Sequence, residues 1–109
     1  MTRAANLPGG CAVILDASVA DKLLAGVVAV GGVVVGPAPG IWPETRAVVQ
    51  RLRELHAGKV PSAIPELEEA RVLYKSFAME PTRHRPSSEA LLRRVLKGED
   101  LYRISNAVD

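Results

Sequence analysis

A stretch of 21 residues without a charged side chain, 23–43, most constrains what this chain can fold into. It is long enough to cross a bilayer as a helix, which takes about 20 residues. It also contains five glycines and three prolines, and so many breaks would leave backbone groups without hydrogen-bond partners in lipid. We therefore predict that this stretch does not cross a membrane and that the protein has no membrane partner.

Two apolar runs are typical of strands. Residues 11–16 (C-A-V-I-L-D) form a compact run between turn-forming residues, and residues 27–35 (V-V-A-V-G-G-V-V-V) are rich in β-branched side chains. Gly31 and Gly32 would form a bulge or a turn that divides the second run. We expect strands over 11–16 and 27–35, two or three in all.

Four segments combine apolar residues at helical spacing with residues that begin or end helices. Asp16 or Ser18 is expected to cap the first, and Pro43 and Pro65 suit the first turns of the second and third. The predicted helices cover 17–25, 43–57, 65–77 and 87–97. Together with the strands they predict a small α/β fold.

Residues 1–10 have no apolar periodicity and end in Pro-Gly-Gly, which predicts a disordered tail before a single partial domain over 11–109. A sheet of two or three strands has open edges and rarely suffices without further cover. We therefore expect an incomplete domain and self-association through an uncovered sheet edge.

The predicted helix 87–97 has two different sides. Ser87 is expected to cap it and Gly98 to end it in a left-handed conformation, while Glu89 suits the positive end of its dipole. One side is aliphatic and comprises Leu91, Leu92, Val95 and Leu96. The other side carries Arg93, Arg94 and Lys97. A solvated surface helix would show the same pattern.

Positive charge gathers in one part of the chain. Residues 1–80 carry eight basic and eight acidic side chains, whereas 81–98 carry five basic side chains against Glu89 alone, an excess of four. Such an excess attracts phosphate without reading base sequence. The candidate RNA-binding residues are Arg83, Arg85, Arg93, Arg94 and Lys97.

The sequence lacks the residue patterns that are typical of several other kinds of functional site. One cysteine, Cys11, and two distant histidines predict no metal site, and no glycine-rich phosphate loop occurs. Nothing in the spacing supports a nucleophile with its base, so we predict no catalytic residue and no cofactor. The connection 78–86 is too long for a helix-turn-helix, which argues against DNA. A single cysteine and no apolar signal core before Pro8 favour a cytoplasmic location.

A longer pattern covers the last part of the chain. It comprises Tyr74-x-x-Phe77, Pro81, the run H-R-P-S-S-E-A-L-L-R-R over 84–94, Gly98, Leu101, Arg103-Ile104 and Val108-Asp109. It resembles the B-three/B-four (tRNA-editing) domain of the phenylalanyl-tRNA synthetase beta chain, and more closely its free-standing bacterial relatives. The resemblance is dense over 65–109, thin before it, and covers the N-terminal half of that domain.

The resemblance implies an α/β domain that binds aminoacylated tRNA. In the synthetase, this domain hydrolyses tyrosine wrongly attached to phenylalanine tRNA by positioning the ester and a water, without a metal. This chain has Ile104-Ser105 where the family usually has Ile-Asn, with an asparagine only at Asn106. It also stops before the segment that carries the family's editing pocket, so no catalytic residue is carried over.

Three functions are compatible with these observations. The first is a tRNA-binding module whose catalysis is lost or lies in a missing C-terminal half. The second is a truncated structural or interaction fragment that binds no nucleic acid. The third is an active aminoacyl-tRNA deacylase.

Overall fold

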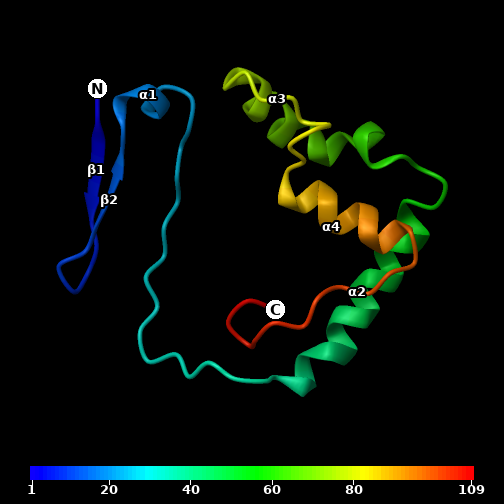
Figure 1. Cartoon of the computed structure of the whole chain (residues 1–109). Helices are drawn as coiled ribbons and strands as arrows, with labels where there is room; N and C mark the ends of the chain where they lie inside the picture. Colours follow the sequence, from blue (N-terminus) through cyan, green and yellow to red (C-terminus); the bar gives the residue numbers. More distant parts are fainter. The chain divides into compact units, whose positions relative to one another are not determined.

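Two strands and four α-helices form the main elements of the computed structural model, which describes residues 1–109 (Figure 1). The predicted small α/β fold, with these numbers of elements, is confirmed. The chain divides into two units, Met1–Val33 and Val34–Asp109, and the division falls inside the range 11–109 that was expected to form one partial domain. No helix combines the length and the apolar character that crossing a membrane requires.

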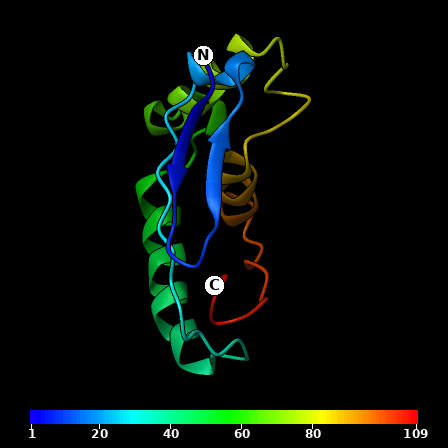
Figure 2. The same cartoon turned by 90° about the vertical axis from the view of Figure 1, so that its left-hand side faces the viewer.

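The first unit is built on a hairpin of β1 (Arg3–Asn6) and β2 (Ala12–Leu15), which Figure 2 shows side by side. The strands are antiparallel, with the first residue of β1 opposite the last residue of β2. Gly9 and Gly10 turn the chain between them with φ of +84° and +79°, which glycine adopts without steric strain. The sequence predicted a disordered tail over 1–10. The structure instead has β1 in this range, because β2 supplies hydrogen-bond partners for its backbone.

The strand predicted over 27–35 is wrong. β2 confirms the strand predicted over 11–16, but its neighbour in the sheet is β1 and not the valine-rich segment. A β-branched sequence forms a strand only where a neighbour pairs with its backbone. Residues 27–35 have no such neighbour in the chain and lie open, with Val28 and Val34 86% and 83% exposed.

α1 (Ala17–Ala20) is shorter than the predicted helix 17–25. Asp16 caps it, since its carboxylate accepts hydrogen bonds from the Ser18 backbone N–H at 2.9 Å and the Ser18 hydroxyl at 2.7 Å. These two donors hold the pKa of Asp16 below its usual value. The helix stops after one turn because only Ala20 is buried, and a short helix without packing is marginal.

The second unit contains α2 (Trp42–Leu55), α3 (Glu68–Ser76) and α4 (Ser87–Leu96), which confirm the helices predicted over 43–57, 65–77 and 87–97. α3 begins later than predicted because Pro65–Leu67 forms a 3-10 turn first. The glycine after α4, Gly98, has a φ of +85°, as the sequence predicts for the end of this helix.

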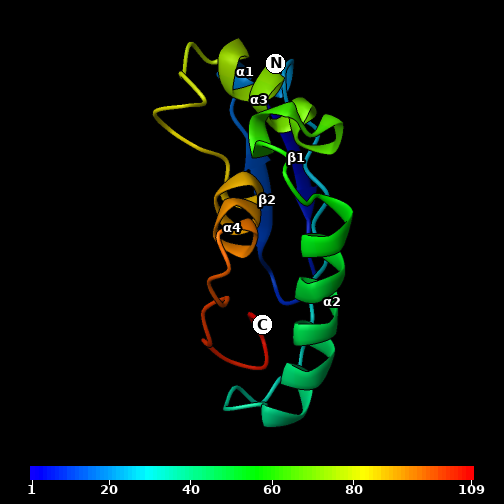
Figure 3. The same cartoon turned by 90° about the vertical axis from the view of Figure 1, so that its right-hand side faces the viewer.

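α2 and α4 pack side by side (Figure 3) and enclose the core of the second unit. Trp42 and Val49 of α2 and Val95 of α4 are buried, with Ile64 and Leu67. Arg53 of α2 donates from Nε to the Val95 carbonyl at 2.9 Å and from Nη2 to the Glu99 carbonyl at 3.2 Å. Because the last carbonyls of a helix lack helical partners, these bonds stabilise the end of α4 and hold it against α2.

A buried ion pair joins α3 to α4. Arg71 Nη1 lies 2.7 Å and 2.8 Å from the two carboxylate oxygens of Glu89, and Glu89 is only 3% exposed. The predicted cap by Ser87 is wrong, because Ser87 is already the first helical residue and Pro86 before it has no side-chain donor or acceptor. Glu89 and Val95 are buried, so one side of α4 contributes to the core, whereas Leu91 of the predicted aliphatic side is 42% exposed.

Candidate nucleic-acid interface

The spacing of the cations along α4 places them together. Residues three, four and seven apart lie on one side of a helix, so Arg93 and Lys97 share a stripe and Arg94 lies beside it. The chain before α4 adds Arg85 and the chain after it adds Tyr102. Together they line a surface depression, the α4 hollow, formed by Arg85, Ala90, Leu91, Arg93, Arg94, Lys97, Glu99 and Tyr102.

Three cations of the α4 hollow are available to a ligand. The side chains of Arg85, Arg93 and Lys97 form no hydrogen bond or ion pair within the protein, and Arg85 and Lys97 are exposed while Arg93 is half-buried. Four basic side chains against one carboxylate leave an excess of three positive charges around the hollow. An excess of this sign and size favours a polyanion.

Arg94 has protein partners already. Its Nη1 lies 2.7 Å from Glu99 Oε2, its Nε donates to the Asp100 carbonyl, and its guanidinium lies 4.4 Å above the centre of the Tyr102 ring. These contacts hold the segment after α4 against the helix. Arg94 is therefore better placed to position Tyr102 than to neutralise a phosphate by itself.

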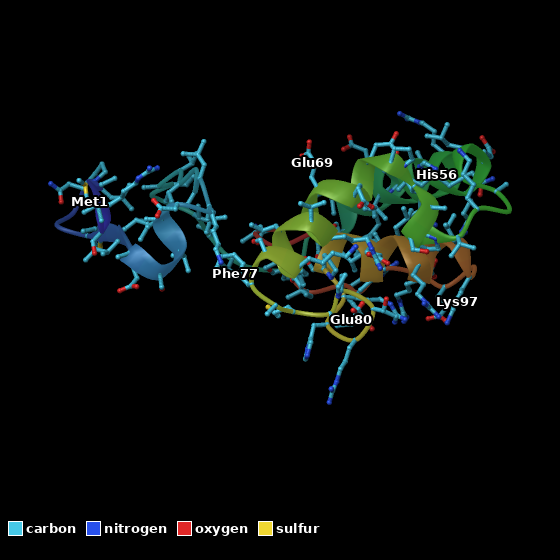
Figure 4. All side chains as sticks on the ribbon, turned by 90° about the horizontal axis from the view of Figure 1, so that it is seen from above. Met1, His56, Glu69, Phe77, Glu80 and Lys97 are labelled. Carbon is cyan, nitrogen blue, oxygen red and sulfur yellow. The ribbon has the colours of Figure 1, made fainter.

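Arg83 is the predicted RNA-binding residue that does not line the α4 hollow. It is exposed in the loop before α4, where its backbone N–H donates to the Glu80 carbonyl at 3.1 Å. In Figure 4, Glu80 and Lys97 lie along one side of the unit, with His56 and Glu69 along the other. The loop that carries Arg83 thus faces the same side as the end of α4.

Glu89 does not offset these cations. Its carboxylate is buried against Arg71, and it does not line the α4 hollow. The acidic residue counted against the cluster in the sequence is therefore neutralised inside the protein. This pairing joins residues 18 positions apart, and no local pattern predicts it.

A second hollow lies on α2 and is less suited to an anion. It is lined by Trp42, Thr45, Arg46, Val49, Gln50, Arg53, Asp100, Leu101 and Arg103. Arg53 is bound to two carbonyls, and the Arg103 guanidinium lies 4.3 Å above the Trp42 ring. Arg46 is exposed there, and Asp100 adds a carboxylate, so the excess around this hollow is two positive charges, against three around the α4 hollow.

The structure contains few side chains that are arranged for acid–base catalysis or metal binding. No three His, Cys, Asp or Glu side chains are arranged to hold a metal ion, and Cys11 is free and exposed. His56 is 7% exposed, and its Nδ1 has no hydrogen-bond partner. Neither His56 nor His84, the two histidines of the chain, lines the α4 hollow.

The sequence patterns did not indicate a structural role for Asn106. Its Nδ2 donates to the Val34 carbonyl at 2.7 Å, its Oδ1 accepts from the Gly36 N–H at 2.9 Å, and its own N–H donates to the Gly36 carbonyl at 2.9 Å. These bonds close a loop of about seventy residues, which no local spacing reveals.

No protein-family model, curated protein or solved structure matches this chain. The resemblance to the B-three/B-four domain therefore rests on the sequence pattern over 65–109, and what it implies about function stays a prediction. A functional proposal must then be supported by the chemistry of the α4 hollow.

Proposed function

We propose that the unit Val34–Asp109 binds RNA through its phosphates at the α4 hollow, and that the RNA is tRNA, as the sequence resemblance implies. The observation that supports this most directly is the set of three unpaired cations, Arg85, Arg93 and Lys97, around one hollow. Lysine and arginine contacts to phosphate dominate RNA affinity because they release condensed counterions.

Tyr102 gives the hollow a second feature that suits RNA. Arg94 lies over its ring, yet Tyr102 remains 63% exposed. An exposed aromatic ring beside cations is the arrangement on which unpaired bases stack, worth about 1–3 kcal/mol per base. Such contacts favour single-stranded loops and ends of RNA over a uniform duplex.

The proposal covers binding and assigns no catalytic residue. No histidine or cysteine lines the α4 hollow, and its one carboxylate, Glu99, is paired with Arg94. General-base catalysis of ester hydrolysis uses a free basic group within reach of the attacking water, and these residues supply none. Binding by these residues is therefore proposed without hydrolysis.

The test is a salt titration of tRNA binding by fluorescence anisotropy. Three phosphate contacts give a slope of about −2 to −3 in log affinity against log salt, and Arg93→Ala or Lys97→Ala should each reduce its magnitude by about 0.7–0.9. The matched control is Arg51→Ala, which removes an exposed, unpaired arginine of α2 outside the hollow.

Equal slopes in the wild-type protein, Arg93→Ala and Arg51→Ala would refute the proposed surface. No binding at low salt would instead support a protein-interaction fragment without a role in RNA binding. Release of tyrosine from mischarged tRNA by this chain would support the deacylase alternative.

A further inference from the structure

Outside the α4 hollow, another depression lies where α2 and α4 end. It is formed by residues 56–59 at the end of α2, residues 96–98 at the end of α4, and Arg53. Gly58 adopts a φ of +72° and Gly98 a φ of +85°, so the chain leaves both helices through left-handed turns at this place. We call this depression the end hollow.

The end hollow carries positive charge without a carboxylate. Arg53, Lys59 and Lys97 line it and no Asp or Glu does, which is an excess of three positive charges with His56 neutral. The C-terminal ends of two helices offset this by about −0.5 elementary charge each, so an excess of about two remains. The side chains of Lys59 and Lys97 are exposed and form no hydrogen bond or ion pair within the protein. The end hollow therefore favours an anionic ligand.

The ring of His56 suits such a ligand. His56 lines the end hollow although it is only 7% exposed, and its side chain forms no hydrogen bond within the protein. Buried polar side chains usually have a hydrogen-bond partner, and a histidine ring N–H can donate to a phosphate oxygen. The volume of the end hollow, about 600 Å³, lies within the range of about 300–1,000 Å³ that is typical of small-ligand sites. Charge, ring and size together suit a phosphate group.

The end hollow adjoins the α4 hollow at Lys97, which lines both. Because Arg53 of α2 donates to the Val95 and Glu99 carbonyls at the end of α4, the backbone segments that carry Lys59 and Lys97 are held together. Cations that continue from one hollow into the next favour a polyanion over a single phosphate, since each neutralised phosphate releases condensed counterions. We propose that the end hollow is a second phosphate site, and that one RNA strand runs from the α4 hollow past Lys97 to Lys59. The choice of RNA rests on the proposed function, whereas the charge of the end hollow does not.

Lys59 adds a fourth phosphate contact to the three at the α4 hollow. The slope of log tRNA affinity against log salt should then be about −2.8 to −3.6 for the wild-type protein, and Lys59→Ala should reduce its magnitude by about 0.7–0.9. The matched control is Lys75→Ala, which removes an exposed lysine of α3 outside both hollows and should leave the slope unchanged. Lys59→Ala combined with Arg93→Ala should reduce the magnitude by about 1.4–1.8, because separate contacts add.

Lysine footprinting tests the same path without changing the protein. The full chain is treated with an amine-reactive ester in the presence and absence of tRNA, and the rate of modification at each lysine is measured by mass spectrometry. At a tRNA concentration about ten times Kd, fewer than about one protein in ten is free, so modification of Lys59 and Lys97 should slow by up to about tenfold. Lys75 should keep its rate, because it is exposed outside both hollows.

The outcomes separate this inference from the proposed function. Equal slopes for Lys59→Ala and Lys75→Ala, or equal protection of the two lysines by tRNA, would overturn the second phosphate site. The proposed function would then still stand if Arg93→Ala reduces the slope. A reduced slope in Lys59→Ala but not in Arg93→Ala would support the end hollow and refute the α4 hollow. Failure of tRNA to bind at low salt would overturn both.

Discussion

Glu89→Ala is expected to destabilise the unit Val34–Asp109 by about 3 kcal/mol, the lower end of the usual cost of breaking a buried ion pair. Glu89 accepts two hydrogen bonds from Arg71 at 2.7 Å and 2.8 Å, and the two side chains are 4% and 12% exposed. Without the carboxylate, the nearly buried guanidinium keeps only its bond of 3.3 Å to Thr82. Because the guanidinium of Arg71 keeps that bond and some access to water, we expect the destabilisation by Glu89→Ala to stay near this lower value.

Urea unfolding followed by far-UV circular dichroism measures this cost, with Glu89→Ala, Arg71→Ala and the double variant compared in one cycle. The double variant should cost about as much as one single variant, because no unpaired charge remains, which gives a coupling energy of about 3 kcal/mol in magnitude. Glu69→Ala, which removes an exposed carboxylate of α3, should stay within about 0.5 kcal/mol of the wild type. A cost below about 1 kcal/mol for Glu89→Ala, or single effects that simply add, would refute the reasoning.

Two further predictions concern local hydrogen bonds. The pKa of Asp16 should lie below its ordinary value of 3.8 in an NMR titration, because the Ser18 N–H and hydroxyl favour the carboxylate. The capping bonds therefore stabilise α1 fully above pH 3.8, and this stabilisation is lost as the pH falls through the lowered pKa. Ser18→Ala should raise the pKa of Asp16, and an unchanged pKa would contradict the role of the hydroxyl. Asn106→Ala should speed hydrogen exchange at the Gly36 amide by about tenfold, because its acceptor is lost, while unchanged exchange would show that this bond does not form in solution.

The helices of the second unit could be predicted from sequence because their signals are local. Apolar spacing and the flanking Pro43, Pro65 and Gly98 act within a few residues, and α2, α3 and α4 lie close to the predicted ranges. The same locality predicted the stripe of Arg93 and Lys97. The strand over 27–35 was wrong for the opposite reason, since a strand depends on a partner that local composition does not supply.

The candidate site was predicted in part. Arg85 joins the cations of α4 at one hollow as expected, but Arg83 in the same loop does not line it. The pairing of Arg94 with Glu99 and Tyr102 depends on how the chain turns after Gly98. Side-chain geometry of that kind depends on packing, which helical spacing does not describe.

By itself, the sequence determined the small α/β class, the three longer helices and the side of α4 on which positive charge gathers, because propensity, periodicity and charge are properties of short segments. Only the tertiary structure decided that β1 and not 27–35 pairs with β2, that Glu89 is buried against Arg71, and that Asn106 holds Gly36. Each of these contacts joins residues that are distant in sequence. Which residues pair depends on which backbone and side-chain groups still lack a hydrogen-bond partner when the chain folds.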